Sequence, residues 1–291
     1  MHVMTSKDFI SSANTATRKD YGIAQLVPYI NWTYFYHAWG LSGKPLEARQ
    51  SLRAEAERML ASLDGRYMTH AVWRVAEANA DGDDIVIAKK HRMPMLRQQH
   101  ADDGTPNLCL ADFIRPLRPG GEADRIGVFA TTVDHGLEHD FRDDDFRRMM
   151  AQTLADRLAE ATAEVAHLEI RTRHWGYAND ECLGIEQLLR EEFQGIRPAV
   201  GYPSMPDTSL NFIIDDIIDM KSIGISLTEN GAMRPHASVS GLMMAHPQAH
   251  YFDIGKIGED QLRDYAARRG VPETLMRRFL ANRVAGECSH S

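Results

Sequence analysis

The sequence predicts an α+β fold with an antiparallel sheet. Its strand candidates follow one another through short polar turns, as in hairpins, and strong helical patterns stand before and after them. No apolar strand runs into a Gly-rich turn that opens a helix, which excludes the GxGxxG and P-loop nucleotide folds. With 291 residues, 43% of them hydrophobic, the chain has enough apolar material for a substantial core.

Composition and charge exclude several classes of partner. Lysine and arginine number 33 against 41 aspartates and glutamates, and there is no basic stripe, so nucleic acid is not expected as a partner. No apolar run approaches the ~18–20 residues of a membrane helix, and the N-terminal MHVMTSKDF lacks the apolar segment of a signal peptide. Cys109, Cys182 and Cys288 show no CxxC spacing, which favours reduced thiols in a cytoplasmic protein over a disulfide framework or a zinc site.

The first part of the chain predicts an arm, an aromatic segment and one helix. Residues 1–28 lack strong periodicity and are expected to form an N-terminal arm, with residues 29–291 as a single domain. Six aromatic residues stand within the twelve positions 29–40, a composition typical of an aromatic plug in a core. In 46–63 apolar residues recur at helical spacing, and Asp64-Gly65 ends that helix.

The middle of the chain supplies the strand candidates and the clearest helix. Strands are predicted at 67–77, 84–89, 108–114 and 126–132. In 141–173 an apolar stripe at steps of three and four predicts a long helix. At about 100° per residue, Glu160 lies on the flank of that stripe and Asp156 nearly opposite it. The residues alone favour two solvated carboxylates.

Residues 134–140, Asp-His-Gly-Leu-Glu-His-Asp, place two histidines four positions apart between carboxylates. On a helix, this spacing would present both imidazoles to one metal ion. The glycine between them and the lack of a third fixed ligand favour a solvated loop, so no metal ligand is predicted.

The last third of the chain predicts a mixture of helices and short strands. Helices are expected at 183–193, 211–220, 259–269 and 272–282, a strand at 223–227, and a hairpin that joins 238–245 to 251–257. Gly270 stops the third of these helices, and Pro272 stands in the first turn of the fourth.

The segment 195–252 is the candidate functional region. It opens with RPAVGYP, in which two prolines and Gly201 define a stiff, non-helical loop that holds Arg197 in a set position. The planar guanidinium of arginine binds a carboxylate through two parallel hydrogen bonds. A surface arginine that caps a carbonyl beside a turn remains an equal alternative on this chemistry alone. The small residues of 237–241 allow close approach to the backbone.

Eight strings in this chain occur in one order and spacing: YINWTYFYHAWGLSGK, NLCLADFIRP, LADRLAEA, WGYANDE, RPAVGYP, LTENGAMRPHASVSG, AHPQAHYF and QLRDYAARRG. In this order they resemble the C-terminal activation domain of cobalamin-dependent methionine synthase, which binds S-adenosylmethionine. The resemblance extends from about Tyr29 to Leu280.

The resemblance implies a fold and a chemistry. The family fold is a single curved domain with a central twisted antiparallel sheet flanked by helices. The function implied is to bind S-adenosylmethionine and to support reductive methylation of cob(II)alamin on a methionine synthase, with an electron from flavodoxin or a similar reductase. Because the cobalt of cobalamin displaces the methyl group from a sulfonium, the chain would supply a binding site to a methyltransferase reaction, with no catalytic acid or base of its own.

The resemblance also assigns site residues. Arg197 would bind the ligand's carboxylate. Glu160, Trp32 and Tyr251 are candidates for its positive charges, and Tyr202 would face the docked corrin. The residues implied to bind the cofactor are Asn31, Glu160, Arg197, Ala199, Gly201, Tyr202, Tyr251 and Phe252.

Three places in the sequence depart from the family pattern. Asn31 stands where the family has Asp, Phe252 where it has Tyr, and residues 204–207 replace a Cys-Pro-Glu-His string. These changes keep open a docking module that no longer binds the ligand. The chain lacks a DxHxxG cobalamin signature, so cobalamin is expected to be held elsewhere, either on a separate partner protein or on the rest of a longer protein from which this chain is a piece. The Met at its start favours the expectation of a free-standing chain with cobalamin on a partner protein. Service to a different corrinoid methyltransferase remains a further alternative.

Overall fold

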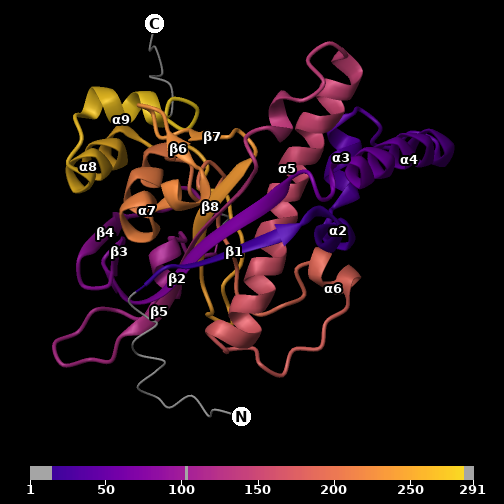
Figure 1. The fold of residues 1–291 in the computed structure, drawn as a ribbon. Helices are drawn as coiled ribbons and strands as arrows, with labels where there is room; N and C mark the ends of the chain where they lie inside the picture. Colours follow the sequence, from indigo (N-terminus) through magenta and orange to yellow (C-terminus); the bar gives the residue numbers. More distant parts are fainter. Residues whose placement is uncertain (1–14, 102–103, 285–291) are drawn as a thin grey trace, which may run out of the picture.

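A curled antiparallel sheet forms the centre of the computed structural model, which describes residues 15–101 and 104–284 (Figure 1). In this part of the chain, β2 and β5 are the long central strands. The order is β4-β3-β2-β5-β8, and β1 pairs with β2 on the same side as β3. The strands are β1 (Thr17–Gly22), β2 (Met68–Asp81), β3 (Asp84–Ile87), β4 (His91–Pro94), β5 (Asp124–Val133) and β8 (Ser238–Met243).

Both faces of the sheet are covered by other parts of the chain. Side chains alternate between the two faces along each strand, and the side chains on each face are buried. On β5, Phe129 and Val133 belong to one buried cluster, whereas Val128 and Ala130 belong to another on the opposite face. Each face therefore needs its own layer of helices and loops, and strands that are apolar on both faces are typical of a sheet buried in this way.

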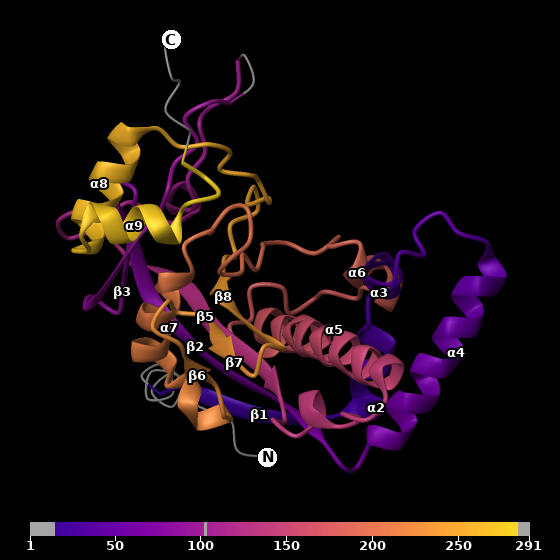
Figure 2. The same ribbon diagram turned by 90° about the horizontal axis from the view of Figure 1, so that it is seen from above.

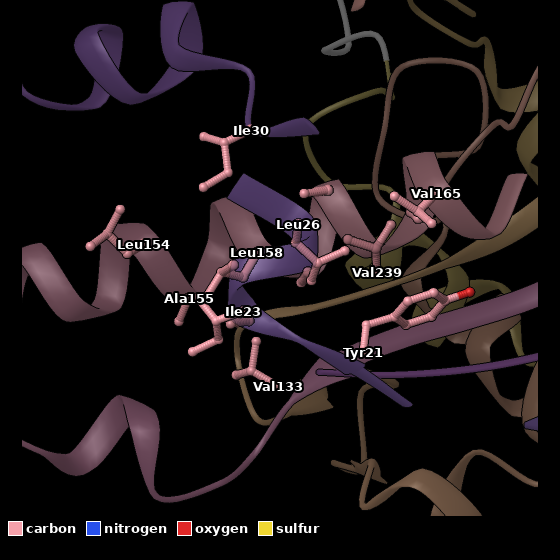
Figure 3. Close-up of a cluster of buried hydrophobic side chains, with 14 of the residues drawn as sticks. Tyr21, Ile23, Leu26, Ile30, Val133, Leu154, Ala155, Leu158, Val165 and Val239 are labelled. Atoms are coloured by element: carbon pink, nitrogen blue, oxygen red, sulfur yellow. The ribbon is translucent and has the colours of Figure 1, made fainter. Parts of the chain in front are cut away.

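The first face is covered by the long helix α5 (Asp145–Glu169), with α2 (Ile23–Leu26), α3 (Trp32–Ala38) and α4 (Leu46–Leu63) beyond it (Figure 2). Figure 3 shows Leu154 and Leu158 of α5 gathered with Ile23 and Leu26 in this core. Alanines on α5 let the helix approach the sheet closely, and Thr131 Oγ1 of β5 donates to the Ala159 carbonyl at 3.0 Å.

The opposite face carries α7 (Asn211–Ile218), whereas the C-terminal helices α8 (Glu259–Arg269) and α9 (Glu273–Phe279) pack in a third buried cluster with Leu96 and Ile254. Both views place α8 and α9 at one end of the molecule and α4 at the other (Figures 1 and 2). The buried Asp207 carboxylate accepts from Tyr265 Oη at 2.9 Å and from Arg269 Nε at 3.3 Å, which fastens α8 to the segment before α7. The remaining α-helix and β-strands of the described residues are α6 (Ile185–Leu189), β6 (Ser226–Leu227) and β7 (Met233–Arg234).

The predicted fold class is confirmed, and several elements match closely. The helix expected at 46–63 is α4, and α8 ends at Gly270, whose φ of 63° is the left-handed conformation that glycine favours. The helix expected at 141–173 is α5 followed by a π-helical turn, Ile170–His174. It begins later than predicted because the Asp144 side chain accepts from Arg147 N–H at 3.0 Å and caps the helix there.

Two predicted strands were wrong, and two predicted elements are less than half as long as expected. Residues 108–114 contain a 3₁₀ turn, Leu110–Phe113, rather than a strand, because the Asp112 carboxylate accepts from the Cys109 N–H at 2.8 Å and holds a turn. Residues 251–257 contain no strand, so the expected hairpin with 238–245 does not exist; β8 pairs with β5 instead. The helix expected at 183–193 is only α6, and the strand expected at 223–227 is only β6.

The domain division stays a prediction. Residues 1–14 of the expected arm lie outside the described residues. Residues 17–26 form β1 and α2; β1 pairs with β2, and Ile23 and Leu26 are buried in the core.

The segment 134–140 is engaged in protein contacts. Asp134 accepts from the Met68 N–H at 2.7 Å, and Asp140 accepts from Arg66 and from Tyr67 Oη. Among the described residues, no group of three or more His, Cys, Asp or Glu side chains is arranged to hold a metal ion. No helix in the same part of the chain is long and apolar enough to span a membrane.

Candidate functional site

A pocket of about 770 Å³ opens between α5 and the segment 196–203. Phe129 of β5 and Val239 of β8 contribute to its wall from the sheet. Asn31, at the start of α3, and residues 251–253 complete it, so the wall is assembled from parts of the chain that are far apart in sequence.

The segment 196–200 is held in place by the free edge of β8. Val200 N–H donates to the Ser240 carbonyl at 2.9 Å, and Leu242 N–H donates to the Pro198 carbonyl at 3.0 Å. A Cβ atom at Gly241 would lie 2.2 Å from the Pro198 oxygen and 2.9 Å from the Ala199 Cα atom. Glycine is therefore required for this close approach, which takes the edge of β8 that the predicted hairpin would have used.

Arg197 forms a buried ion pair with Glu164. The Arg197 Nη2 atom donates to Glu164 Oε2 at 2.5 Å, and the two side chains are only 13% and 5% exposed. Burial raises the pKa of the Glu164 carboxyl above its ordinary value, against the lowering effect of the Arg197 and Arg171 guanidiniums. Arg197 Nη1 and Glu164 Oε1 are buried without a hydrogen-bond partner among the described residues. The pair therefore has unused hydrogen-bonding capacity.

A second buried ion pair, Arg171 with Glu181, lies near the pair of Arg197 and Glu164, and the Phe193 ring contacts both guanidiniums. Arg171, fully buried, donates to both oxygens of Glu181 at 2.8–3.1 Å. The Phe193 ring lies 4.1 Å from the Arg171 guanidinium and 5.7 Å from that of Arg197. His167, also fully buried, contacts Tyr177 Oη at 3.1 Å; burial and then the two guanidiniums lower its pKa well below the ordinary value, so this imidazole is neutral.

Tyr251 holds the backbone of the 196–203 segment. Its hydroxyl accepts from the Arg197 N–H at 3.0 Å. Burial of the hydroxyl end raises the pKa of Tyr251 to about 12, although the nearby Arg197 charge opposes this. The phenol is therefore protonated at neutral pH, and its own proton is available to an acceptor in the pocket.

The opposite end of the pocket carries Tyr202 and Glu160. Tyr202 Oη donates to Glu160 Oε1 at 2.5 Å, and Tyr202 is 50% exposed. Both residues also line a smaller adjoining pocket of about 220 Å³, together with Asp156 and His236. This end of the site is accordingly open to the surface.

Asn31 is the N-cap of α3. Its Oδ1 atom accepts from the Thr33 N–H at 3.1 Å, a contact that Asp would make equally well. Because Oδ1 already accepts the hydrogen bond from the Thr33 N–H, the group that Asn31 can offer to a ligand in the pocket is its Nδ2 amide, which is an uncharged donor.

Seven of the eight predicted cofactor-binding residues line this one pocket: Asn31, Glu160, Arg197, Ala199, Tyr202, Tyr251 and Phe252. Gly201 does not line it and instead adopts a φ of 90°, which turns the segment toward Tyr202. Trp32 does not line it either, because its ring packs against the Arg53 guanidinium and Phe35.

The sequence analysis missed other lining residues, including Tyr29, Tyr34, Arg157, Glu164, Glu191 and Asp253. A signal for Glu164 was present in the sequence. It lies three residues after Ala161 and four before Leu168, on the apolar face of the helix, where a carboxylate requires a partner. Glu191 and Asp253 carried no comparable signal, because each lies in an irregular segment whose path only the fold determines.

Carboxylates outnumber guanidiniums around the pocket. Four carboxylates line it, and so do two guanidiniums, those of Arg157 and Arg197. A ligand with a net positive charge therefore matches the charge of the pocket.

Two comparisons with known proteins agree on a family. The sequence model described as "Vitamin B12 dependent methionine synthase, activation domain" matches residues 22–270. Among solved structures, the crystal structure of the MetH reactivation domain bound to AdoHcy superimposes with a TM-score of 0.87 at 38% sequence identity. That match covers 94% of this chain and 91% of the other.

Proposed function

The chain belongs to the family of vitamin B12-dependent methionine synthase activation domains, and on this premise we propose that it binds S-adenosylmethionine in the pocket between α5 and the 196–203 segment. The bound molecule would be the methyl donor for reductive methylation of cob(II)alamin held by a cobalamin-dependent methionine synthase. The electron would come from flavodoxin or a similar reductase.

One observation carries the proposal: a buried guanidinium stands at one end of a pocket with an excess of carboxylates. S-adenosylmethionine has one carboxylate, one ammonium and one sulfonium. Arg197 offers a charge-assisted donor for the carboxylate, and the acidic surroundings favour the two cations. The similar reactivation domain was solved with AdoHcy, which has the same adenosine, carboxylate and ammonium groups.

The ligand's orientation follows from the order of these groups along α5. Glu160 precedes Glu164 by one turn, a rise of about 6 Å. With the ligand's carboxylate at Arg197, the sulfonium and its methyl group would lie toward Glu160 and Tyr202, at the exposed end of the pocket. The adenine would then occupy the slot between the Ala199 backbone and residues 251–252.

When bound to the partner, cobalamin would supply the nucleophilic cobalt for the displacement. What this chain contributes is position: Arg197 and Glu164 fix one end of the donor, and the open end leaves its methyl group accessible to a second protein. No proton transfer by a side chain is required in such a displacement.

Titration calorimetry with S-adenosylmethionine and with AdoHcy tests the proposal. The matched variant is Glu164→Gln/Arg197→Gln, which replaces the buried ions by neutral amides and leaves no buried charge unpaired. We expect the variant to bind at least about tenfold more weakly, a loss of ~1.4 kcal/mol, while its thermal unfolding stays cooperative. No binding of either ligand to the wild-type chain at millimolar concentration would refute the proposal and favour the docking module. With binding established, methylation of cob(II)alamin on a methionine synthase that lacks this domain tests the second half.

A further inference from the structure

Tyr177 contacts the backbone just before Arg197. Its hydroxyl donates a long hydrogen bond, 3.4 Å, to the Gln194 carbonyl. At Gly195, a Cβ atom would lie 3.0 Å from the Tyr177 oxygen and 2.2 Å from the Met244 carbonyl oxygen. The chain at Gly195 therefore passes between the Tyr177 hydroxyl and the residue that follows β8, with no room for a side chain.

His167, in the last turn of α5, fixes the direction of the Tyr177 hydroxyl. Its Nε2 atom lies 3.1 Å from Tyr177 Oη, and its side chain is fully buried. A carbonyl oxygen only accepts, so the proton of Tyr177 is directed to Gln194 and the hydrogen between the two side chains belongs to His167 Nε2. The imidazole also packs edge-on against Phe193, with ring centroids 5.0 Å apart. His167 thus couples the backbone at 193–194 to α5.

α5 therefore holds Arg197 at two points. Glu164, one turn before His167, accepts from the Arg197 guanidinium at 2.5 Å and so fixes the side chain. His167 and Tyr177 fix the backbone at 194–195. Neither of these two residues lines the pocket. Any effect that they have on a ligand must be exerted through the segment that they support.

From these contacts we infer that Tyr177 is a positioning residue for ligand binding and that His167 acts with it by orienting its hydroxyl. The inference rests on the proposed function and deepens it. A guanidinium binds a carboxylate well only at the right distance and direction, and a displacement of about 1 Å costs much of the gain. With the backbone at 194–195 released, Arg197 would stay paired with Glu164 but lose its set position relative to the rest of the pocket.

The loss should fall on the amino-acid end of the ligand and spare the adenosine end. The backbone around Ala199, against which the adenine would lie, is held separately by the hydrogen bonds of Val200 and Pro198 with β8. A ligand without the carboxylate therefore does not depend on Tyr177.

The test compares AdoHcy with methylthioadenosine, which keeps the adenosine and the sulfur atom but lacks the amino-acid end. Calorimetry is performed on the wild-type chain, on Tyr177→Phe and on the matched control Tyr265→Phe. The control also removes a tyrosine hydroxyl from a hydrogen bond, the one to Asp207 at 2.9 Å, but at a residue that does not line the pocket. We expect Tyr177→Phe to bind AdoHcy at least about fivefold more weakly than the wild type and methylthioadenosine equally well. Tyr265→Phe should bind both compounds like the wild type, whatever its loss of stability in urea.

Variants of His167 test its part. His167→Gln keeps a donor at the place of Nε2 and should keep most of the affinity for AdoHcy. His167→Leu lacks that donor, so it should lose affinity as Tyr177→Phe does, and the double variant His167→Leu/Tyr177→Phe should be no weaker than either single variant. Added to Glu164→Gln/Arg197→Gln, Tyr177→Phe should cause no further loss, because its effect is exerted through Arg197.

The outcomes separate the two claims. If the wild type binds neither compound, the proposed function fails and the inference fails with it. If Tyr177→Phe binds AdoHcy as tightly as the wild type, or weakens both compounds by the same factor, the ligand site stands and Tyr177 has no positioning role. A further loss when Tyr177→Phe is added to the Arg197 variant, or a selective loss in Tyr265→Phe, would also overturn the inference.

Discussion

Glu160 and Glu164 lie one turn apart on α5, but their surroundings differ. Glu160 is partly exposed and accepts from the hydroxyl of Tyr202, whereas Glu164 is buried and accepts from a guanidinium. For a buried pair, the cost of removing both ions from water is offset only while both partners are present. Glu164 is therefore important for folding as well as for holding Arg197.

We expect Glu164→Ala to lower the free energy of unfolding by about 3–5 kcal/mol, because it leaves the Arg197 charge buried and unpaired. Urea denaturation measures this. Glu55→Ala on α4 is the matched control: Glu55 also pairs with an arginine on a helix, Arg58, but that pair is exposed, so a change below about 1 kcal/mol is expected. Similar losses in both variants would contradict the buried-pair argument.

The packing of the 196–200 segment against β8 is the contact between elements on which the pocket depends. Gly241 permits it, and the segment in turn places Arg197 opposite α5. A change at this contact should affect stability and ligand binding together, even though Gly241 does not line the pocket.

Gly241→Ala is expected to destabilise the protein by about 1–3 kcal/mol, because the new methyl group overlaps the Pro198 carbonyl. It should also weaken S-adenosylmethionine binding by displacing Arg197. In the control Gly184→Ala, the added Cβ would meet nothing nearer than 3.7 Å, so its effect should be below about 1 kcal/mol. Denaturation and calorimetry on both variants check this; unchanged affinity in Gly241→Ala would show that the segment does not depend on the close approach.

At the other edge of the sheet, His70 joins β1 and the end of β5 to β2. Its Nδ1 lies 2.7 Å from Asp20 and its Nε2 lies 3.0 Å from Asp134. Burial acts to lower the pKa of His70, but the hydrogen bonds to the two carboxylates prevail and raise it above the ordinary value. The protonated imidazole is thus stabilised in the folded state.

The sign of the pH effect follows from linkage. A raised folded-state pKa adds stability that is fully present below pH ~6.5 and is lost as the pH rises through the folded-state pKa. We expect the stability advantage of the wild type over His70→Gln to shrink between about pH 6 and 8. The total change should be below about 1 kcal/mol, because Asp20 is mostly exposed. Denaturation of both proteins across this range measures it, and an advantage that grows with pH would contradict the assignment.

These contacts explain which elements the sequence predicted well. Residues 46–63 and 259–269 were assigned correctly because helical periodicity and the residues that end a helix are local signals. Residues 108–114 and 251–257 are apolar enough for strands, but Asp112 and the occupied edge of β8 decide their structure through contacts that the local pattern does not contain. Arg197 was found from its motif; its partner Glu164 required knowing which face of α5 is buried.

At the scale of the whole molecule, the pocket joins parts of the chain that fold against different elements. Asn31 caps α3, and Glu160 and Glu164 belong to α5. Arg197 lies in the segment that pairs with the edge of β8, and residues 251–253 come from the irregular segment between β8 and α8. A ligand that contacts all of these should stabilise them as a unit rather than order one loop. Linkage sets the size of this effect through the ligand concentration and affinity alone.

We therefore expect S-adenosylmethionine at about 100 times its dissociation constant to add ~2.7 kcal/mol to the free energy of unfolding. Hydrogen exchange should slow together in residues 29–34, 196–203 and 251–253, because each segment opens only after the ligand has left. The exposed turn at Gly82, between β2 and β3, serves as the internal control, since it contributes nothing to the pocket and should exchange at an unchanged rate. In Glu164→Gln/Arg197→Gln, neither the stabilisation nor the protection should appear at the same ligand concentration. Protection confined to 196–203 would indicate that the ligand contacts the segment alone, and would place it outside the pocket formed with α5.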